Sequence, residues 1–349
     1  MPIQTTTIGA YPKPDYVPVP DWFREESTVA KDPTRALDDC IECHDPQVGE
    51  VLDRATREVV LEQDQLGIDV PTDGEIRREN YIHYHCRNLT GIDFAGLTQK
   101  AMRDSQWTVA VPTITGPVKA GDAFLVRDWQ VAQGVTGKPV KITLPGPLTI
   151  IDSTYNAFYD DDRKLAADLA SAINIEVCNL ARAGCRWIQI DEPIFAREPE
   201  NALAFGIENL ERCFFGIPDN VQRTIHICCG YPDRLDSEDY QKAPPQNYFH
   251  LAPALDEAAL NAISIEDAHR PNDLGLLELF KHRTVILGVI GIARSRIETV
   301  AEIVTRLRQA LDHIDKERLA AAPDCGLGML DRRQVQAKLA NMVEAAKLV

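Results

Sequence analysis

Residues 138–192 read KPVKITLPGPLTIIDSTYNAFYDDDRKLAADLASAINIEVCNLARAGCRWIQIDE. Two short runs of apolar and β-branched residues, 140–144 and 186–190, flank a longer segment, 163–183, in which apolar residues recur every three or four positions. The short runs predict buried strands, and the longer segment predicts an amphipathic helix. A strand, helix and strand in this order indicate an α/β fold around a parallel sheet.

The same alternation extends over the rest of the chain. Further runs that predict strands occupy residues 5–10, 67–71, 224–228, 262–266, 285–290 and 319–322, and helical periodicity covers 48–66 and 297–314. Eight strands in 349 residues fit one (β/α)8 barrel, a TIM barrel, which spans roughly 200 to over 400 residues. We therefore expect residues 1–349 to form a single catalytic domain.

The segment 76–138 is too long for an ordinary connection between a barrel strand and the next helix. It contains a strand-like run at 107–114 and a helix-like run at 122–133. The sequence therefore predicts a hairpin and a helix inserted after the second strand, over the face of the barrel that carries active sites.

Composition and charge exclude several classes of partner. A formal net charge of −16 argues against nucleic acid, because binding to a phosphate backbone needs clustered lysine and arginine. The chain does not begin with a basic and then apolar leader, and no apolar run approaches the ~18 residues of a membrane span. These features predict a cytoplasmic protein that does not bind membranes.

Cysteine usage points to chemistry more than to disulfides. The chain has 9 cysteines, an odd number, and no secretory signal, so some are candidates for metal binding or catalysis. Cys40, Cys43 and His44 have the spacing of c-type haem attachment. Because that attachment normally follows export, we interpret this segment as part of the first helical region of the barrel.

Candidate metal ligands lie at the ends of predicted strands. His226 and Cys228 are two positions apart and leave the same face of a strand, whereas Cys229 leaves the opposite face. Glu266 ends the next strand and Cys325 follows the last one. The His-Ile-Cys pair alone is equally consistent with interior packing. Because strand ends meet at one rim of a barrel, the set of imidazole, carboxylate and two thiols predicts zinc and disfavours magnesium and calcium.

Two further carboxylates follow predicted strands. Glu75 stands after the second strand and Asp191 after the fourth. Paired carboxylates are suited to accept hydrogen bonds from a substrate ammonium group. The alternative interpretation is that each lies in a surface loop and caps the following helix.

Seven motifs, in this order, resemble the C-terminal catalytic barrel of cobalamin-independent methionine synthase, including short forms that lack the N-terminal half. They are TTIGAYPKP (6–14), DGE (73–75), GPLT (146–149), IQIDEP (188–193), HIC (226–228), ISIE (263–266) and PDCGL (323–327). The resemblance implies a zinc-dependent methyltransferase that converts homocysteine to methionine. Its implied zinc ligands are His226, Cys228, Glu266 and Cys325. Its implied homocysteine contacts are Ile8, Gly9 and Ala10 at the amino-acid head and Glu75 and Asp191 at the amino group.

Three departures from the family pattern concern the substrates. Ala10 replaces a serine that contacts the carboxylate of the amino acid, Ala293 stands where longer enzymes have a catalytic histidine, and the aromatic residue that stacks on folate is replaced near Ser153. A methyl donor that leaves from cobalt needs no proton and hence no acid. We therefore expect methylcobalamin or a corrinoid protein, and not methylfolate, to supply the methyl group.

The mechanism assigned from sequence gives catalytic roles to Asp191 and Glu266. Zinc lowers the pKa of a bound thiol from about 8.5 to below neutrality, and we expect Glu266 to be the ligand that gives way to the substrate sulfur. One alternative is thiol alkylation of the epoxyalkane:coenzyme M transferase type, with Arg294 or Arg296 on the sulfonate. Another is a non-catalytic zinc- or corrinoid-handling protein, and a metal-independent decarboxylase is disfavoured by the thiols.

Overall fold

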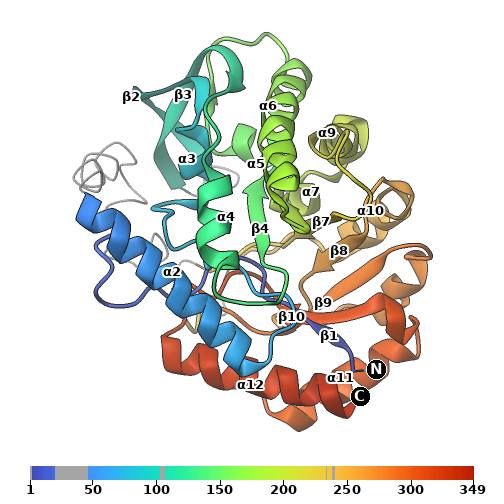
Figure 1. Ribbon diagram of the computed structural model, residues 1–349. Helices are drawn as coiled ribbons and strands as arrows, with labels where there is room; N and C mark the ends of the chain where they lie inside the picture. Colours follow the sequence, from blue (N-terminus) through green and yellow to red (C-terminus); the bar gives the residue numbers. More distant parts are fainter. Residues whose placement is uncertain (1, 20–45, 103–106, 233, 238–239) are drawn as a thin grey trace.

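Seven parallel strands form a curled sheet at the centre of the molecule (Figure 1). The structure is a computed structural model, and it describes residues 2–19, 46–102, 107–232, 234–237 and 240–349. The strands, in their order across the sheet, are β1 (Gln4–Thr5), β10 (Leu319–Pro323), β9 (Thr284–Ile290), β8 (Ala262–Ile265), β7 (Gln222–Ile227), β6 (Trp187–Asp191) and β4 (Lys141–Pro145).

The two edges of this sheet approach each other through residues 70–72. Thr6, just after β1, forms a parallel bridge with Val70, and Thr72 forms another with Lys141 in β4. The predicted α/β fold with a parallel sheet is therefore confirmed, and the curled sheet is consistent with a TIM barrel. The predicted strand at 67–71 is present only as these bridges.

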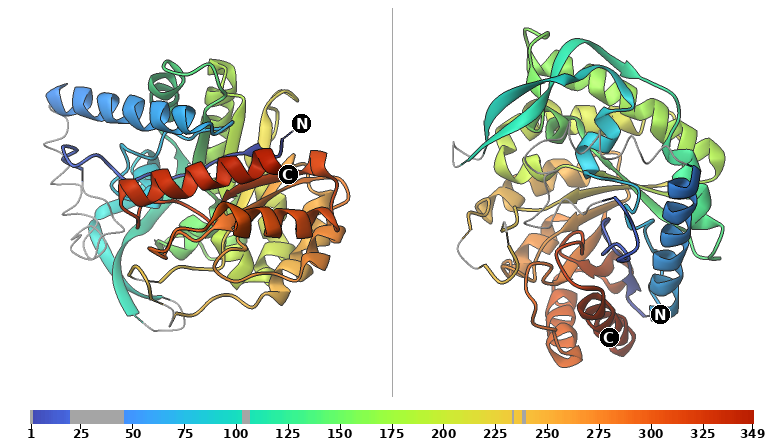
Figure 2. Two further views of the ribbon diagram at one scale, coloured as in Figure 1. Left: turned by 90° about the horizontal axis from the view of Figure 1, so that it is seen from below. Right: turned by 90° about the vertical axis from the view of Figure 1, so that its left-hand side faces the viewer.

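Helices cover the outside of the sheet (Figures 1 and 2). The helices of eight or more residues are α2 (Pro46–Leu66), α4 (Leu125–Gln133), α6 (Asp162–Ala183), α10 (Gln246–Glu257), α11 (Val300–Leu311) and α12 (Arg332–Leu348). Shorter helical segments are α3 (Tyr81–Cys86), α5 (Pro147–Asp152), α7 (Pro193–Arg197), α8 (Pro199–Asn201), η3 (Ala202–Gly206), α9 (Ile207–Cys213), η4 (Leu274–Leu279) and η5 (Lys316–Arg318). The predicted helices at 48–66, 122–133, 163–183 and 297–314 correspond to α2, α4, α6 and α11.

The burial of the barrel strands explains why continuous apolar runs in the sequence predicted them correctly. Along β10, Ala320 and Ala322 belong to a small interior cluster, whereas Leu319 and Ala321 pack into the large core between sheet and helices. Side chains alternate between the two faces of a strand, so both faces of a barrel strand are apolar. The interior cluster consists of Ile8, Val70, Trp187, Ala262, Ile286, Ala320 and Ala322.

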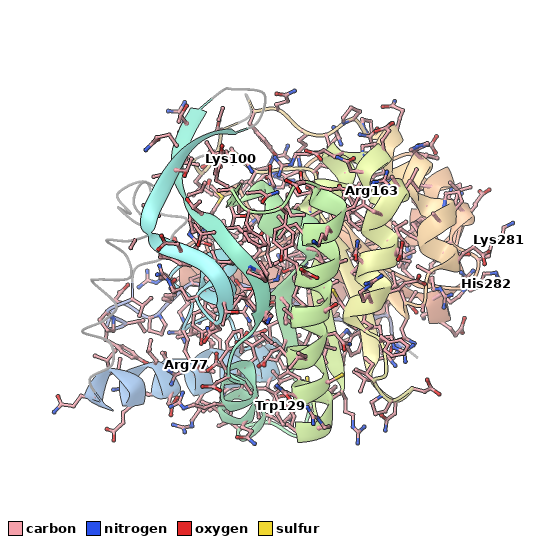
Figure 3. All side chains as sticks on the ribbon, turned by 90° about the horizontal axis from the view of Figure 1, so that it is seen from above. Arg77, Lys100, Trp129, Arg163, Lys281 and His282 are labelled. Carbon is pink, nitrogen blue, oxygen red and sulfur yellow. The ribbon has the colours of Figure 1, made fainter. Side chains whose placement is uncertain are left out.

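An antiparallel pair, β2 (Leu89–Met102) and β3 (Trp107–Ala120), lies between α3 and α4 in the chain. Lys100, labelled on this pair in Figure 3, donates hydrogen bonds to the carbonyls of Ile151, Asp152 and Thr154 at 2.9, 2.8 and 2.8 Å. These carbonyls stand at the C-terminal end of α5, where a cation is favoured. The pair is thereby tied to the segment that contains Ser153.

Two predictions of local structure need comment. The predicted strand 5–10 was too long, because β1 ends at Thr5 and the Gly9 and Ala10 segment turns toward a cavity described below. The haem-like segment with Cys40, Cys43 and His44 lies outside the described residues. None of the helices in the described part of the chain has the length and apolar character needed to cross a bilayer.

Candidate metal centre

Three of the predicted zinc ligands come together at the carboxyl ends of the strands. Donor atoms of His226, Cys228 and Cys325 all lie within 4.8 Å of one another. His226 is the next-to-last residue of β7, Cys228 follows that strand, and Cys325 follows β10. The parallel strands place all three at one rim. Cys229 packs in the outer core with 1% exposure, as its opposite orientation predicted.

The His226 ring is oriented as a metal ligand would be. Its Nδ1 lies 2.9 Å from the Ser264 hydroxyl oxygen, and its Nε2 has no hydrogen-bond partner although the residue is only 1% exposed. A buried polar atom without a partner is costly, so it calls for a ligand. A second partner on the other ring nitrogen is what metal-bound histidines usually have. These residues therefore fit a zinc ion by both donor type and orientation.

The pKa values of the two thiols are shifted strongly in opposite directions. The hydrogen bond from Cys325 is the main reason why the pKa of the Cys228 thiol is held well below its usual range, and His226 adds to this effect. Burial and the neighbouring Cys228 raise the pKa of Cys325 well above its usual range. The Tyr231 hydroxyl contributes a hydrogen bond to this pair. The lowered pKa of Cys228 favours the thiolate form that a metal ligand needs.

Glu266 lies beside this cluster but outside the group of three. Its carboxylate is 1% exposed and forms a close ion pair with Lys242 through Oε1, while the backbone amide of Cys229 donates to Oε2 at 3.1 Å. Burial raises the pKa of Glu266, Lys242 opposes that shift, and Cys228 adds to it. The Cys228 charge therefore acts on Glu266 although its carboxylate is bound to a lysine.

A cavity of about 230 Å³ opens onto the thiols and the imidazole. Its walls include the predicted substrate residues Ile8, Gly9, Ala10, Glu75 and Asp191. They also include Tyr81, Ile82, Asp152, Ser153, Pro193, Arg197, Gly230, Tyr231 and Gly326. The structure therefore places the predicted substrate residues, Arg294 excepted, around one space beside His226, Cys228 and Cys325.

Asp191 ends β6 inside this cavity. It is 7% exposed, and its Oδ1 accepts a hydrogen bond from Gln189 at 2.7 Å. Burial raises the pKa of Asp191 to about 7, His226 lowers it, and Glu75 raises it. A cation placed here would restore the charged carboxylate, so this position is prepared for a positively charged group.

Glu75 is held by neighbours within the barrel wall. Its Oε1 accepts hydrogen bonds from Thr143 at 2.7 Å and from Arg78 at 3.1 Å. A Cβ at Gly9 would lie 2.6 Å from this oxygen, so only glycine lets the first-strand turn approach it. Arg78 is 2% exposed, and sequence reasoning did not identify it as the partner of Glu75.

Arg294 and Ala293 lie away from the cavity walls. Two guanidinium nitrogens of Arg294 donate to the carbonyls of Ala268 and His269 at 3.4 and 3.1 Å. The backbone amide of Ala293 donates to His269 Nε2 at 3.0 Å. Burial, with Lys242 and Arg294 nearby, lowers the pKa of His269 to about 3, so this imidazole is neutral and accepts hydrogen bonds at Nε2.

Several residues of the site were missed by sequence reasoning. They are Arg78, Tyr81, Tyr231, Lys242 and Ser264. Ser264 had a usable signal, because it is two positions before Glu266 in the same strand and so faces the same side. Lys242 had none, because it lies in a loop without periodicity.

Asp324 supports the loop that follows Glu266. It is fully buried, its Oδ1 accepts the amides of Asp267 and Ala268 at 2.8 Å each, and its Oδ2 accepts the amide of His269 at 2.7 Å. The carboxylate also fills the space in which a Cβ of Gly288 would lie. This residue, which precedes Cys325, therefore fixes the backbone that follows Glu266.

We expect Asp324→Ala to lower the free energy of unfolding of the metal-free protein by about 3 kcal/mol or more, because three buried amides lose their acceptor. Urea unfolding in the presence of a chelator measures it. Asp324→Asn keeps an acceptor oxygen and should lose less. Equal stability of wild type and Asp324→Ala would contradict this role.

The chain is similar to known proteins over nearly its whole length. A family model described as the catalytic domain of cobalamin-independent synthase matches residues 3–348. Methionine synthases of Sulfolobus acidocaldarius and Sulfurisphaera tokodaii are 31% and 32% identical to the chain, each match covering 99% of the chain and 92% of the relative.

Solved structures give the same picture. A B12-independent methionine synthase from Shewanella sp. W3-18-1, in complex with selenomethionine, is 28% identical with a TM-score of 0.87, and the match covers 100% of this chain and 98% of that one. A putative vitamin-B12 independent methionine synthase from Listeria monocytogenes is 19% identical with a TM-score of 0.72, covers 99% and 97% of the two chains, and supports the fold alone.

Proposed function

The chain belongs to the cobalamin-independent methionine synthase family, a family of methyltransferases, and from this premise we propose that it transfers a methyl group to the sulfur of homocysteine at a zinc ion. The proposed ligands are His226, Cys228, Glu266 and Cys325. We further propose that residues 1–349 act as one catalytic domain in the cytoplasm.

The observation that carries this proposal is the buried His226 Nε2 without a partner, next to the thiols of Cys228 and Cys325, at the wall of the cavity. Bound zinc would supply a Lewis acid that holds the substrate sulfur as a thiolate at neutral pH. Ser264 would orient the His226 ring, and Tyr231 lies against the thiols. The hydrophobic walls would exclude water from the sulfur.

Other residues in the lining of the cavity support homocysteine as the substrate. Asp191 and Glu75 provide buried carboxylates for an ammonium group, and Ile8, Gly9 and Ala10 provide backbone for the amino-acid head. The Shewanella relative holds selenomethionine, the selenium analogue of the expected product. Arg197 is the arginine among the described lining residues, and it is paired with Asp152 at 2.8 Å. The cavity therefore supports a thiol with an ammonium group, such as homocysteine, better than a thiol with a sulfonate, such as coenzyme M.

For the methyl donor we propose a methylcorrinoid, either methylcobalamin or a corrinoid protein. Among the described residues that line the cavity, His226 supplies the imidazole, and it is already assigned to the metal. His269, the imidazole nearest to Ala293, is neutral and occupied by two backbone amides. When the methyl group leaves folate, the folate nitrogen must take up a proton, whereas cobalt needs none. The lack of an available acid therefore favours a corrinoid as the methyl donor.

We expect the zinc-loaded protein to form methionine from homocysteine and methylcobalamin, and to form none above background from methylated folate. Product detection by mass spectrometry measures this, with free methylcobalamin and homocysteine as the control for the uncatalysed reaction. Rapid turnover with the folate would refute the donor assignment but not the thiol assignment. Zinc binding without product from any donor would favour the alternative of a zinc- or corrinoid-handling protein.

A further inference from the structure

The Glu266 carboxylate has two possible partners, the group of candidate metal ligands and Lys242. On one side are the thiols of Cys228 and Cys325 and the free nitrogen of His226; on the other is Lys242, which holds Oε1 in a close ion pair. In this structure the carboxylate lies with Lys242 and outside the group of three donor atoms. A buried carboxylate without a partner is strongly unfavourable, so Glu266 needs one of these partners at all times.

Lys242 is built into this position. Its side chain is 9% exposed, and its ammonium group lies 5.3 Å from the centre of the Tyr240 ring. The loop is fixed to the end of β7 because the amide of Ala243 donates to the Cys229 carbonyl at 3.0 Å. The carbonyl of Ala243 accepts a hydrogen bond from Arg270 at 2.7 Å. These contacts bring the lysine to Glu266 from the irregular loop between β7 and α10.

Cys229 supplies the pivot for the carboxylate. Its backbone amide donates to Oε2 at 3.1 Å, whereas Oε1 is the oxygen held by Lys242. For Oε1 to move away from the lysine, the Glu266 side chain must rotate while the backbone and the contact of Oε2 stay in place. In the position seen in this structure the carboxylate lies outside the group of three donor residues, so it would leave a fourth place at a metal to another ligand.

We propose that Lys242 is a positioning residue that receives the Glu266 carboxylate when the sulfur of the substrate takes its place at the metal. This inference rests on the proposed function. The ion pair with Lys242 stabilises the state in which the thiol is bound and competes with the metal in the state without thiol. Lys242 therefore weakens resting zinc binding and strengthens thiol binding.

The test compares Lys242→Met, Lys242→Gln and Lys242→Arg with wild type, using Lys281→Met as a control for charge. Lys281 is exposed and lies at the periphery of the molecule in Figure 3. Zinc affinity is measured by competition with a chelator in the absence of any thiol. We expect Lys242→Met and Lys242→Gln to bind zinc about tenfold more tightly than wild type, because Glu266 loses its competing charged partner. Lys242→Arg and Lys281→Met should stay close to wild type.

Two further readouts separate positioning from a merely structural role. The KM for homocysteine should rise about tenfold in Lys242→Met with a smaller change in kcat, because the displaced carboxylate has no partner. Combining Lys242→Met with Glu266→Gln should remove the effect of the lysine substitution on zinc affinity, since the two residues then no longer interact.

The outcomes distinguish this inference from the proposed function. A wild-type protein that binds no zinc would overturn the proposed function itself. A wild type that binds zinc, with unchanged or weaker zinc affinity in both Lys242→Met and Lys242→Gln, would overturn only the role of Lys242. Circular dichroism identifies a variant that fails to fold, and the other substitution then decides.

Discussion

Replacing Cys228 or Cys325 with serine is expected to reduce bound zinc from about one ion per chain to less than about a tenth, because a hydroxyl does not replace a thiolate as a ligand. Both cysteines lie within 4.8 Å of the His226 donor atom, and the pKa of the Cys228 thiol is held well below its usual range by the hydrogen bond from Cys325. Metal analysis of the purified variants measures the loss. The thermal stabilisation that zinc gives to wild type should disappear in the same variants.

The matched control is Cys185→Ser. Cys185 is buried, as Cys228 is, but lies in the outer core, with its thiol 3.3 Å from the Trp187 carbonyl oxygen. This variant should keep its zinc, which excludes a general effect of removing a buried cysteine. Full zinc content in both Cys228→Ser and Cys325→Ser would show that the cluster is not the metal site.

Asp191→Asn is expected to lower kcat/KM for homocysteine by about 10- to 150-fold, which corresponds to ~1.5 to 3 kcal/mol for a charge-assisted hydrogen bond in a buried site. Asp191 is buried at the cavity wall, and its raised pKa indicates that an approaching cation would restore its charge. The amide keeps the shape of the side chain and its hydrogen bond from Gln189 but provides no charge. Steady-state kinetics at saturating methyl donor measure the loss.

Zinc content is the control for this variant. Asp191 is not assigned to the metal, so Asp191→Asn should bind zinc as wild type does. Arg294→Ala and Arg296→Ala test the alternative thiol, coenzyme M, which has a sulfonate and no ammonium group. An enzyme that is indifferent to Asp191→Asn and loses activity in an arginine variant would refute homocysteine as the substrate.

Periodicity in the sequence was enough to place the main elements. The apolar runs at 140–144 and 186–190 became β4 and β6 because both faces of a barrel strand are buried, and α6 began and ended at residues with clear capping signals. Asp161 caps its first turn, and Gly184 ends it in the left-handed region with φ 109°. The length of the first strand was overestimated because Ile8, which lies after the strand, is as apolar as a residue within a strand.

The regular geometry of strands also explains why the sequence predicted that His226, Cys228 and Cys325 lie close together. The period of two along a strand fixed which side chains share a face, and the convergence of strand ends fixed that they meet. These two rules do not depend on the details of packing. They act on residues inside a strand or within two positions of its end, where the backbone of the strand strongly influences the direction of a side chain.

Tertiary structure alone decided which partner each buried charge takes. Glu266 lies with Lys242 beside the thiols, and Glu75 is held by Arg78. Lys242 comes from an irregular loop, and its direction depends on contacts of Tyr240 and Ala243 with distant residues. A buried charge pairs with the nearest group of opposite charge. Which group is nearest is decided only when the chain has folded. The sequence determined the ligand types, and folding determined the charge balance around them.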